Sequence, residues 1–96
     1  MHISPTDKLK ISDQVLDQEV RGETVLLDLA SENYFGLDSV GTRIWQMLGE
    51  GKQLAEIIAT LLEEYEVEKE HLETDVNELL TNLVQTGLVT VSHDAS

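Results

Sequence analysis

Histidines, serines and clustered carboxylates are the residue types in this 96-residue chain that could carry chemistry. The three histidines, His2, His71 and His93, are far apart in the sequence, whereas a metal site needs several ligands that converge. None of the serines lies in the glycine-flanked elbow that exposes a hydrolase nucleophile. Cysteine is absent, which excludes thiolate nucleophiles and disulfides. The residue types therefore predict a protein that is not an enzyme and has no metal or cofactor.

The charge balance limits the partners that the chain can have. The sequence holds 19 Asp and Glu against 6 Lys and Arg, a formal net charge of −13. Such a field repels the phosphates of nucleic acids and anionic membrane surfaces. No apolar run approaches the roughly 18 residues of a spanning helix, and the N-terminus lacks the apolar core of a signal peptide. We expect one small cytoplasmic domain that binds neither nucleic acid nor membrane.

Two hydrophobic periods along the chain indicate an α+β fold. Residues 1–13 show no sustained pattern, which is typical of a flexible N-terminal segment. Over residues 15–37 apolar and polar residues alternate, which predicts three antiparallel strands, near 14–20, 24–30 and 33–38. Arg21-Gly22 suits the first turn.

The second turn decides which face of this sheet is buried. A loop of residues 31–33, with Asn33 in the left-handed conformation, places Leu29 opposite Phe35 and Leu27 opposite Leu37. The helices are then expected to cover the face formed by Val25, Leu27, Leu29, Phe35 and Leu37. The other face would carry Leu26, Asp28, Ala30, Tyr34 and Gly36.

After the third strand the apolar period changes to 3.6 residues, which predicts three helices. The first begins at Asp38-Ser39, either of which can cap it, and ends at Gly49. The second spans about 53–65, and the third spans about 68–86 and stops at Gly87. Residues 88–91 are a candidate short strand before a flexible tail, 92–96. The residues expected in the helical core are Trp45, Ile57, Ile58, Leu61 and Leu62.

The expected domain, residues 14–91, is winged helix-turn-helix-like, with an N-terminal three-stranded antiparallel sheet packed on three helices and a short C-terminal strand. Many winged helices read DNA with their last helix. Here eight acids lie between Glu63 and Glu78, against the single base Lys69. Because phosphate contacts need Lys and Arg, the fold favours a function other than DNA binding.

The predicted sheet has an open edge at its last strand. Asn33-Tyr-Phe-Gly-Leu37 contains no charge and no proline, the residues that proteins use to block an edge. An unblocked edge can add a peptide from another molecule as an extra strand. The plainer interpretation is that Tyr34 and Gly36 only complete a hairpin, and the residues alone leave both interpretations open.

Several short motifs, weak singly, occur together in a fairly specific order and spacing. They are Val25-Leu-Leu-Asp28, Asn33-Tyr-Phe-Gly-Leu-Asp38, Val40-Gly41-x-x-Ile44-Trp45, the Ile57/Ile58 helix, Asp75-Val76, and Leu83 through Gly87-Leu88-Val89. With them, the chain resembles the PqqD-like family over residues 14–91. These proteins are RiPP recognition elements, which bind the leader segments of ribosomally made peptide precursors. Asp38, where the family often has Asn, and Gln53, where a Ser or Thr cap is usual, depart from the pattern only at helix caps.

The resemblance implies that a leader peptide joins residues 33–37 as an antiparallel strand and lies in a groove walled by the third helix. The residues implied to bind it are Asn33, Tyr34, Phe35, Gly36, Leu37, Asp75, Val76, Glu78, Leu79, Asn82 and Leu83. Val76, Leu79 and Leu83 also fit a plain core stripe. Asp75 and Glu78 would favour a leader that carries Lys or Arg.

The resemblance also implies the role of the complex. The chain would deliver a precursor to maturation enzymes, which in lasso-peptide biosynthesis are a transglutaminase-like leader peptidase and a cyclase. The alternative within the family is a peptide chaperone for a radical SAM enzyme in pyrroloquinoline quinone biosynthesis. A winged-helix regulator that binds DNA or another protein, and a dimerisation module that pairs the open strand with itself, are the alternatives from other classes.

Overall fold

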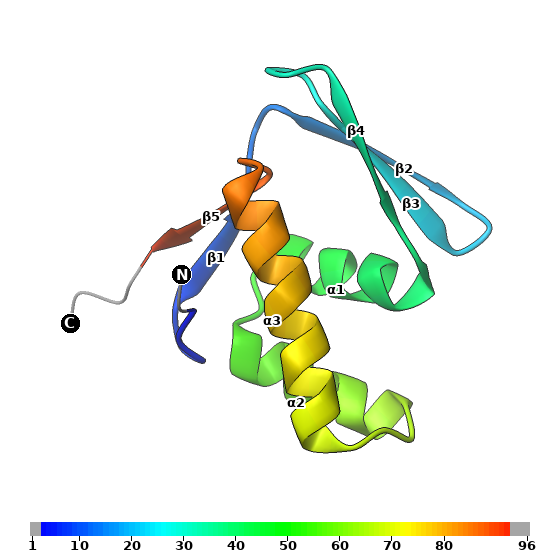
Figure 1. Cartoon of the computed structure of the whole chain (residues 1–96), viewed down its shortest axis with the longest axis vertical. Helices are drawn as coiled ribbons and strands as arrows, with labels where there is room; N and C mark the ends of the chain where they lie inside the picture. Colours follow the sequence, from blue (N-terminus) through cyan, green and yellow to red (C-terminus); the bar gives the residue numbers. More distant parts are fainter. Residues whose placement is uncertain (1–2, 93–96) are drawn as a thin grey trace.

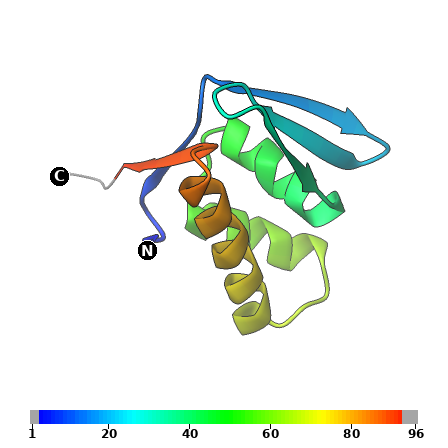
Figure 2. The ribbon, with the colours of Figure 1, turned by 45° about the horizontal axis from the view of Figure 1, so that its top comes forward.

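The computed structural model describes residues 3–92, which form two antiparallel sheets and three helices (Figure 1). The elements in chain order are β1 (Lys8–Ile11), β2 (Val15–Val20), β3 (Glu23–Asp28), β4 (Asn33–Leu37), α1 (Ser39–Gly49), α2 (Leu54–Glu64), α3 (Lys69–Gln85) and β5 (Val89–Ser92). The three-stranded sheet has the order β2-β3-β4 and lies over α1 (Figure 2). The expected α+β architecture of a three-stranded antiparallel sheet on three helices is confirmed, as is the short C-terminal strand.

The β2–β3 hairpin has the turn that its sequence predicts. Arg21 and Gly22 both have positive φ, 54° and 82°, which a two-residue turn between twisted strands requires. Val20 pairs with Glu23 directly across this turn. The position of Gly22 is therefore explained by local backbone geometry.

The β3–β4 hairpin has a different loop from the expected one. Four residues, 29–32, connect the strands, and Asp28 organises them: its carboxylate accepts from the Ala30 N–H at 3.1 Å and from the Ser31 hydroxyl at 2.7 Å. The Glu32 N–H donates to the Asp28 carbonyl at 2.7 Å, and Glu32, with φ 62°, takes the left-handed position predicted for Asn33. Local side-chain bonds of this kind compete with continued strand pairing.

The shorter β3 changes the register, so the predicted pairing was wrong. Phe35 lies opposite Leu26, three residues before the predicted Leu29, and Tyr34 lies opposite Leu27. An odd shift exchanges the two faces of a strand. Leu26 is consequently fully buried, whereas Val25 and Leu29, expected in the core, are each 44% exposed.

Phe35 and Leu37 still face the helices as expected, because the change affects β3 and not β4. Leu37 is buried and Phe35 packs partly buried against the core. The three helices supply most of the remaining core, including Ile44, Met47, Ile57, Leu61, Val76, Leu80 and Leu83. Of the residues expected in this core, Trp45, Ile57, Ile58 and Leu61 are buried, and Leu62 packs against it partly buried.

Helix ends follow capping rules. The Asp38 carboxylate accepts from the Gly41 N–H at 2.8 Å, so Asp38 is the cap of α1. α1 ends at Gly49 as predicted, and the left-handed residue that follows it is Gly51, φ 83°. Gly87, φ 82°, follows the end of α3 as predicted, and the Leu88 N–H donates to the Leu83 carbonyl at 2.9 Å.

The N-terminal segment contains a strand that the sequence pattern did not reveal. β1 pairs with β5, Leu9 opposite Val91, and Ile3 and Leu9 are buried. The Ala55 N–H also donates to the Pro5 carbonyl at 3.1 Å, which joins this segment to the start of α2. The prediction of a flexible segment was therefore wrong at 8–11, because a four-residue strand is too short to show a period. In the predicted tail, Ser92 belongs to β5 and residues 93–96 lie outside the described residues.

We expect Asp38→Ala to lower the free energy of unfolding by about 1 kcal/mol, because it removes the acceptor that caps α1. The neighbouring Ser39→Ala is the matched control and should change stability by less than about 0.5 kcal/mol. Urea unfolding followed by circular dichroism measures both. Equal losses from the two variants would contradict the assignment of Asp38 as the cap.

Candidate functional site: an open strand edge above an apolar groove

The two outer strands of the three-stranded sheet, β2 and β4, could each accept another strand. In an antiparallel ladder, successive residues direct their N–H and C=O groups to opposite sides of the strand. The Leu29 N–H donates to the Gln14 carbonyl and therefore points towards β2, so Asp28, Leu26 and Thr24 bond towards β4. Their partners in β4 use their backbone groups inside the sheet. The backbone groups of Tyr34 and Gly36 point outwards and form the open edge.

The opposite edge, at β2, is blocked by its own side chains. Asp17 points inwards and accepts from the Trp45 indole N–H at 2.8 Å, and Glu19 accepts from the Gln46 side chain at 2.9 Å. Inward-pointing charges next to an edge are a device that proteins use against unwanted strand addition. β4 has no such charge among Asn33–Leu37. Strand addition is therefore favoured at β4.

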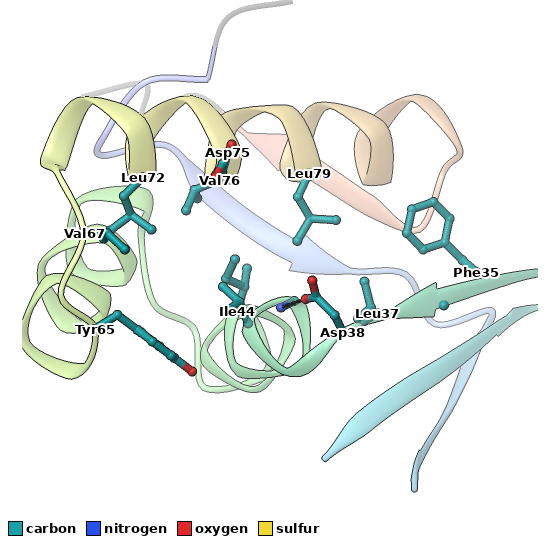
Figure 3. A pocket seen from close by; sticks show the side chains of 13 residues that line it. Phe35, Leu37, Asp38, Ile44, Tyr65, Val67, Leu72, Asp75, Val76 and Leu79 are labelled. Carbon is teal, nitrogen blue, oxygen red and sulfur yellow. Dashed lines mark hydrogen bonds between the residues drawn. The ribbon is translucent and has the colours of Figure 1, made fainter. Parts of the chain in front are cut away.

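A groove of about 570 Å³ runs beside β4, between α1 and α3. Phe35 and Leu37 of β4 lie at one end, and Tyr65 and Val67, from the connection between α2 and α3, lie at the other (Figure 3). Leu72, Asp75, Val76 and Leu79 form the α3 wall, and Asp38, Val40, Gly41 and Ile44 form the α1 side. The lining is mainly apolar, which suits side chains that anchor a peptide.

A second hollow of about 350 Å³ continues along β4 towards the end of α3. Its lining residues are Asp28, Ser31, Asn33, Tyr34, Phe35, Thr86 and Leu88. Phe35 borders both hollows and separates the apolar groove from this more polar one. A peptide along β4 would thus pass two chemically different pockets.

Most of the site residues expected from the sequence meet at these hollows. Eight of them line one or both: Asn33, Tyr34, Phe35, Gly36, Leu37, Asp75, Val76 and Leu79. The structure does not bring Glu78, Asn82 and Leu83 there. None of the three lines either hollow: Glu78 and Asn82 are exposed on α3, and Leu83 is fully buried in the core.

Sequence reasoning missed the far end of the groove. Tyr65 and Val67 lie in the connection between α2 and α3 and are 36% and 44% exposed. A pair of apolar side chains in an otherwise acidic connection was the available signal. The guanidinium of Arg43 binds the Glu64 carboxylate through Nε and Nη2, at 3.0 and 2.9 Å, and this holds α1 against the end of α2 beside Tyr65. The same hydrogen bonds lower the pKa of Glu64 and raise that of Arg43.

The charged groups at the groove are carboxylates. Asp38 and Asp75 are the only Asp, Glu, Lys, Arg or His residues in the described lining. Oδ2 of Asp75 lies 3.4 Å from Nε2 of His71, and both side chains are exposed. Over residues 3–92 no three His, Asp or Glu side chains are placed to share a metal ion. None of the helices in that range is long and apolar enough to cross a bilayer.

Two solved structures are similar to this chain. The first is described as TbiB1 in complex with the TbiA(beta) leader peptide: it is 42% identical, covers 83% of this chain and 93% of its own, and has a TM-score of 0.79. The second is described as lasso peptide synthetase B1 complexed with the leader peptide: it is 29% identical, covers 85% of this chain and 96% of its own, and has a TM-score of 0.78. No curated protein matched the chain by sequence.

The family comparison agrees with the structural one. The sequence profile of the family described as coenzyme PQQ synthesis protein D (PqqD) matches residues 23–89. This range begins at β3 and includes β4, all three helices and the open edge with its groove. The chain therefore belongs to the PqqD family.

Proposed function

We propose that this chain is a RiPP recognition element that binds the leader segment of a ribosomally made precursor peptide. The leader adds to β4 as an antiparallel strand, and its inward side chains enter the groove. The observation that carries this proposal is the position of an unblocked edge directly beside an apolar groove. Both similar structures are described as complexes with leader peptides, which supports the same occupant.

The energies show that edge and groove must act together. Tyr34 and Gly36 each offer one N–H and one C=O, and each hydrogen bond contributes about 0.5–1.5 kcal/mol net. Association costs at least about 4 kcal/mol, so the ladder alone would bind weakly. Burying one large apolar side chain in the groove adds about 1.5–3 kcal/mol. The ladder therefore sets the direction of the peptide, and the anchors supply much of the affinity and the selectivity.

The complex has a delivery role in this proposal, without chemistry of its own. Only the leader is held, so the rest of the precursor stays free to reach a separate enzyme, and binding raises its effective concentration there. Because both similar structures carry lasso-peptide or leader-peptide descriptions, we propose a leader peptidase and a cyclase of a lasso-peptide pathway as the enzymes served.

The description of the family profile favours a second candidate, delivery of a precursor for coenzyme PQQ synthesis. The two candidates differ in the leader that binds. Parallel titrations with the TbiA(beta) leader and with the leader of a PQQ precursor separate them, because the pockets beside β4 should discriminate between two different sets of anchors.

The first test is binding of the fluorescently labelled TbiA(beta) leader, measured by polarisation. We expect saturable binding to the wild-type chain and none to Gly36→Pro, because proline removes an outward N–H and puts its ring against the added strand. Circular dichroism and size exclusion should show that the variant remains folded. Failure of the wild-type chain to bind at high micromolar peptide would contradict the proposed function.

Glu19→Pro is the matched control for this variant. It places the same ring on the outward backbone of the other edge strand, β2, which is already blocked by its acids. Binding should stay within about twofold of wild type, since rim changes away from the contact have small effects. If Glu19→Pro lost binding and Gly36→Pro kept it, the peptide would bind at β2, which would contradict the proposed site at β4.

The second test concerns charge. We expect a lysine substituted into the leader at the position beside Asp75 to bind roughly twofold to fivefold more tightly than glutamate there, since an exposed pair contributes little more. Asp75→Asn should abolish most of this difference, and raised salt should reduce it. Glu78→Gln is the control, because Glu78 does not line the groove. A lysine scan with equal effects in both variants would argue against a role of Asp75 in binding.

A further inference from the structure

The outer face of the sheet, which no helix covers, holds exposed apolar residues next to the open edge. Tyr34 is 74% exposed and lies opposite Leu27, and Val25 is 44% exposed and lies opposite Gly36. These positions alternate with Phe35 and Leu37, whose side chains point to the helices. The outer face beside β4 is therefore apolar and open.

Gly36 has no role in the fold of the free chain that requires glycine. Its φ is not in the left-handed region, and a Cβ atom built on it would have no neighbouring atom within 4 Å. A glycine inside a strand weakens that strand, because it adds backbone entropy to the unfolded state and packs no side chain. Because Gly36 has no side chain, a side chain at the open edge of β4 could lie across it and contact Val25, which is directly opposite and exposed.

A strand added to β4 would present side chains beside Gly36. Residues directly opposite Tyr34 and Gly36 point to the same outer face as those two residues, whereas the residue opposite Phe35 points into the groove. A large side chain opposite a strand glycine can lie across it and pack on the next strand, an arrangement that compensates for edge glycines in sheets. Here the residue on the next strand is Val25.

We propose that the bound peptide is read on two faces, and that the residue opposite Gly36 is a large apolar or aromatic side chain that lies across Gly36 onto Val25, beside Tyr34. This inference rests on the proposed function and adds a specificity site outside the groove. Neighbouring residues of the bound strand point to opposite faces of the sheet. The residue that packs on Val25 is therefore next in sequence to a residue that enters the groove, and the recognised segment contains two adjacent apolar residues.

Gly36→Val tests the proposal, because valine keeps the outward N–H but fills the space that Gly36 leaves open. We expect the variant to melt at the same temperature as wild type or higher, since β-branched residues suit strands and the space is empty. It should nevertheless bind the TbiA(beta) leader roughly threefold to tenfold more weakly. An alanine scan of the leader against both proteins should find one apolar position whose replacement weakens binding to wild type but hardly affects Gly36→Val.

Gln18→Val is the matched control. It adds the same side chain to the same outer face, on β2 beyond Val25, where a strand added to β4 makes no contact. Its affinity for the leader should equal that of wild type. Val25→Thr changes the residue on which the leader side chain would pack and keeps its shape. It should reduce the contribution to binding of the same leader residue as Gly36→Val does. This second variant keeps the test valid if the glycine variant fails to fold.

The outcomes distinguish this inference from the proposed function. Loss of binding in Gly36→Pro together with wild-type affinity in both Gly36→Val and Val25→Thr would overturn the outer-face site and leave strand addition standing. Absence of binding to the wild-type chain would remove both. Coupling of both variants to a single apolar leader position, with Gln18→Val unchanged, is the result that supports the proposal.

Discussion

The hydrogen bonds of the Asp28 side chain within the β3–β4 loop determine which backbone groups of β4 form the open edge. They end β3 at Asp28 and set the pairing of Phe35 with Leu26. With that register, Leu26 fills the core, and the backbone groups of Tyr34 and Gly36 point to solvent. If the loop were one residue shorter, the residues of β3 that pair with Phe35 and Leu37 would be those that now face solvent, and the buried ones would turn outwards. Asp38, which caps α1 immediately after β4, fixes the other end of the strand against the helix that floors the groove.

The two edges of the small sheet differ in the side chains that an added strand would meet. Both edges expose backbone groups, but at β2 Asp17 and Glu19 occupy the inward positions that an added strand would share. At β4 the inward positions are Phe35 and Leu37, which continue into the groove. The two edges differ in their side chains and not in their backbone, and this difference would direct an added peptide to β4.

The structure shows which of the many acidic side chains lies beside the groove. The run of acids between Glu63 and Glu78 extends from the end of α2 through the α2–α3 connection and along α3, and most of its members are exposed. Asp75 is the member of that run that reaches the groove, while Glu78, one turn away, does not. The net charge of −13 thus creates a general field that would favour basic partners, and Asp75 is the one carboxylate of this run that lines the groove.

The sequence determined the features that depend on neighbours along the chain. The Arg21-Gly22 turn, the start of α1 at Asp38-Ser39, the glycine stop at Gly87 and the apolar stripes of α2 and α3 are local, and their patterns predicted them. The open character of β4 was also readable, since it is an absence of charge and proline within five residues. Family resemblance then placed most of the candidate site on that strand and on α3.

Only the tertiary structure decided the features that depend on distant partners. β1 exists because β5, some eighty residues later, pairs with it, and a four-residue strand has no period of its own. The register of β3 followed from side-chain bonds in a loop and not from the alternation of Val25 to Leu29, which fits either face. Likewise the rotation of α3 placed Leu83 in the core and Asn82 in solvent, while the α2–α3 connection brought Tyr65 and Val67 to the groove. Periodicity shows that a helix or strand has an apolar face, but the packing of that face against the rest of the chain determines which residues remain for a ligand.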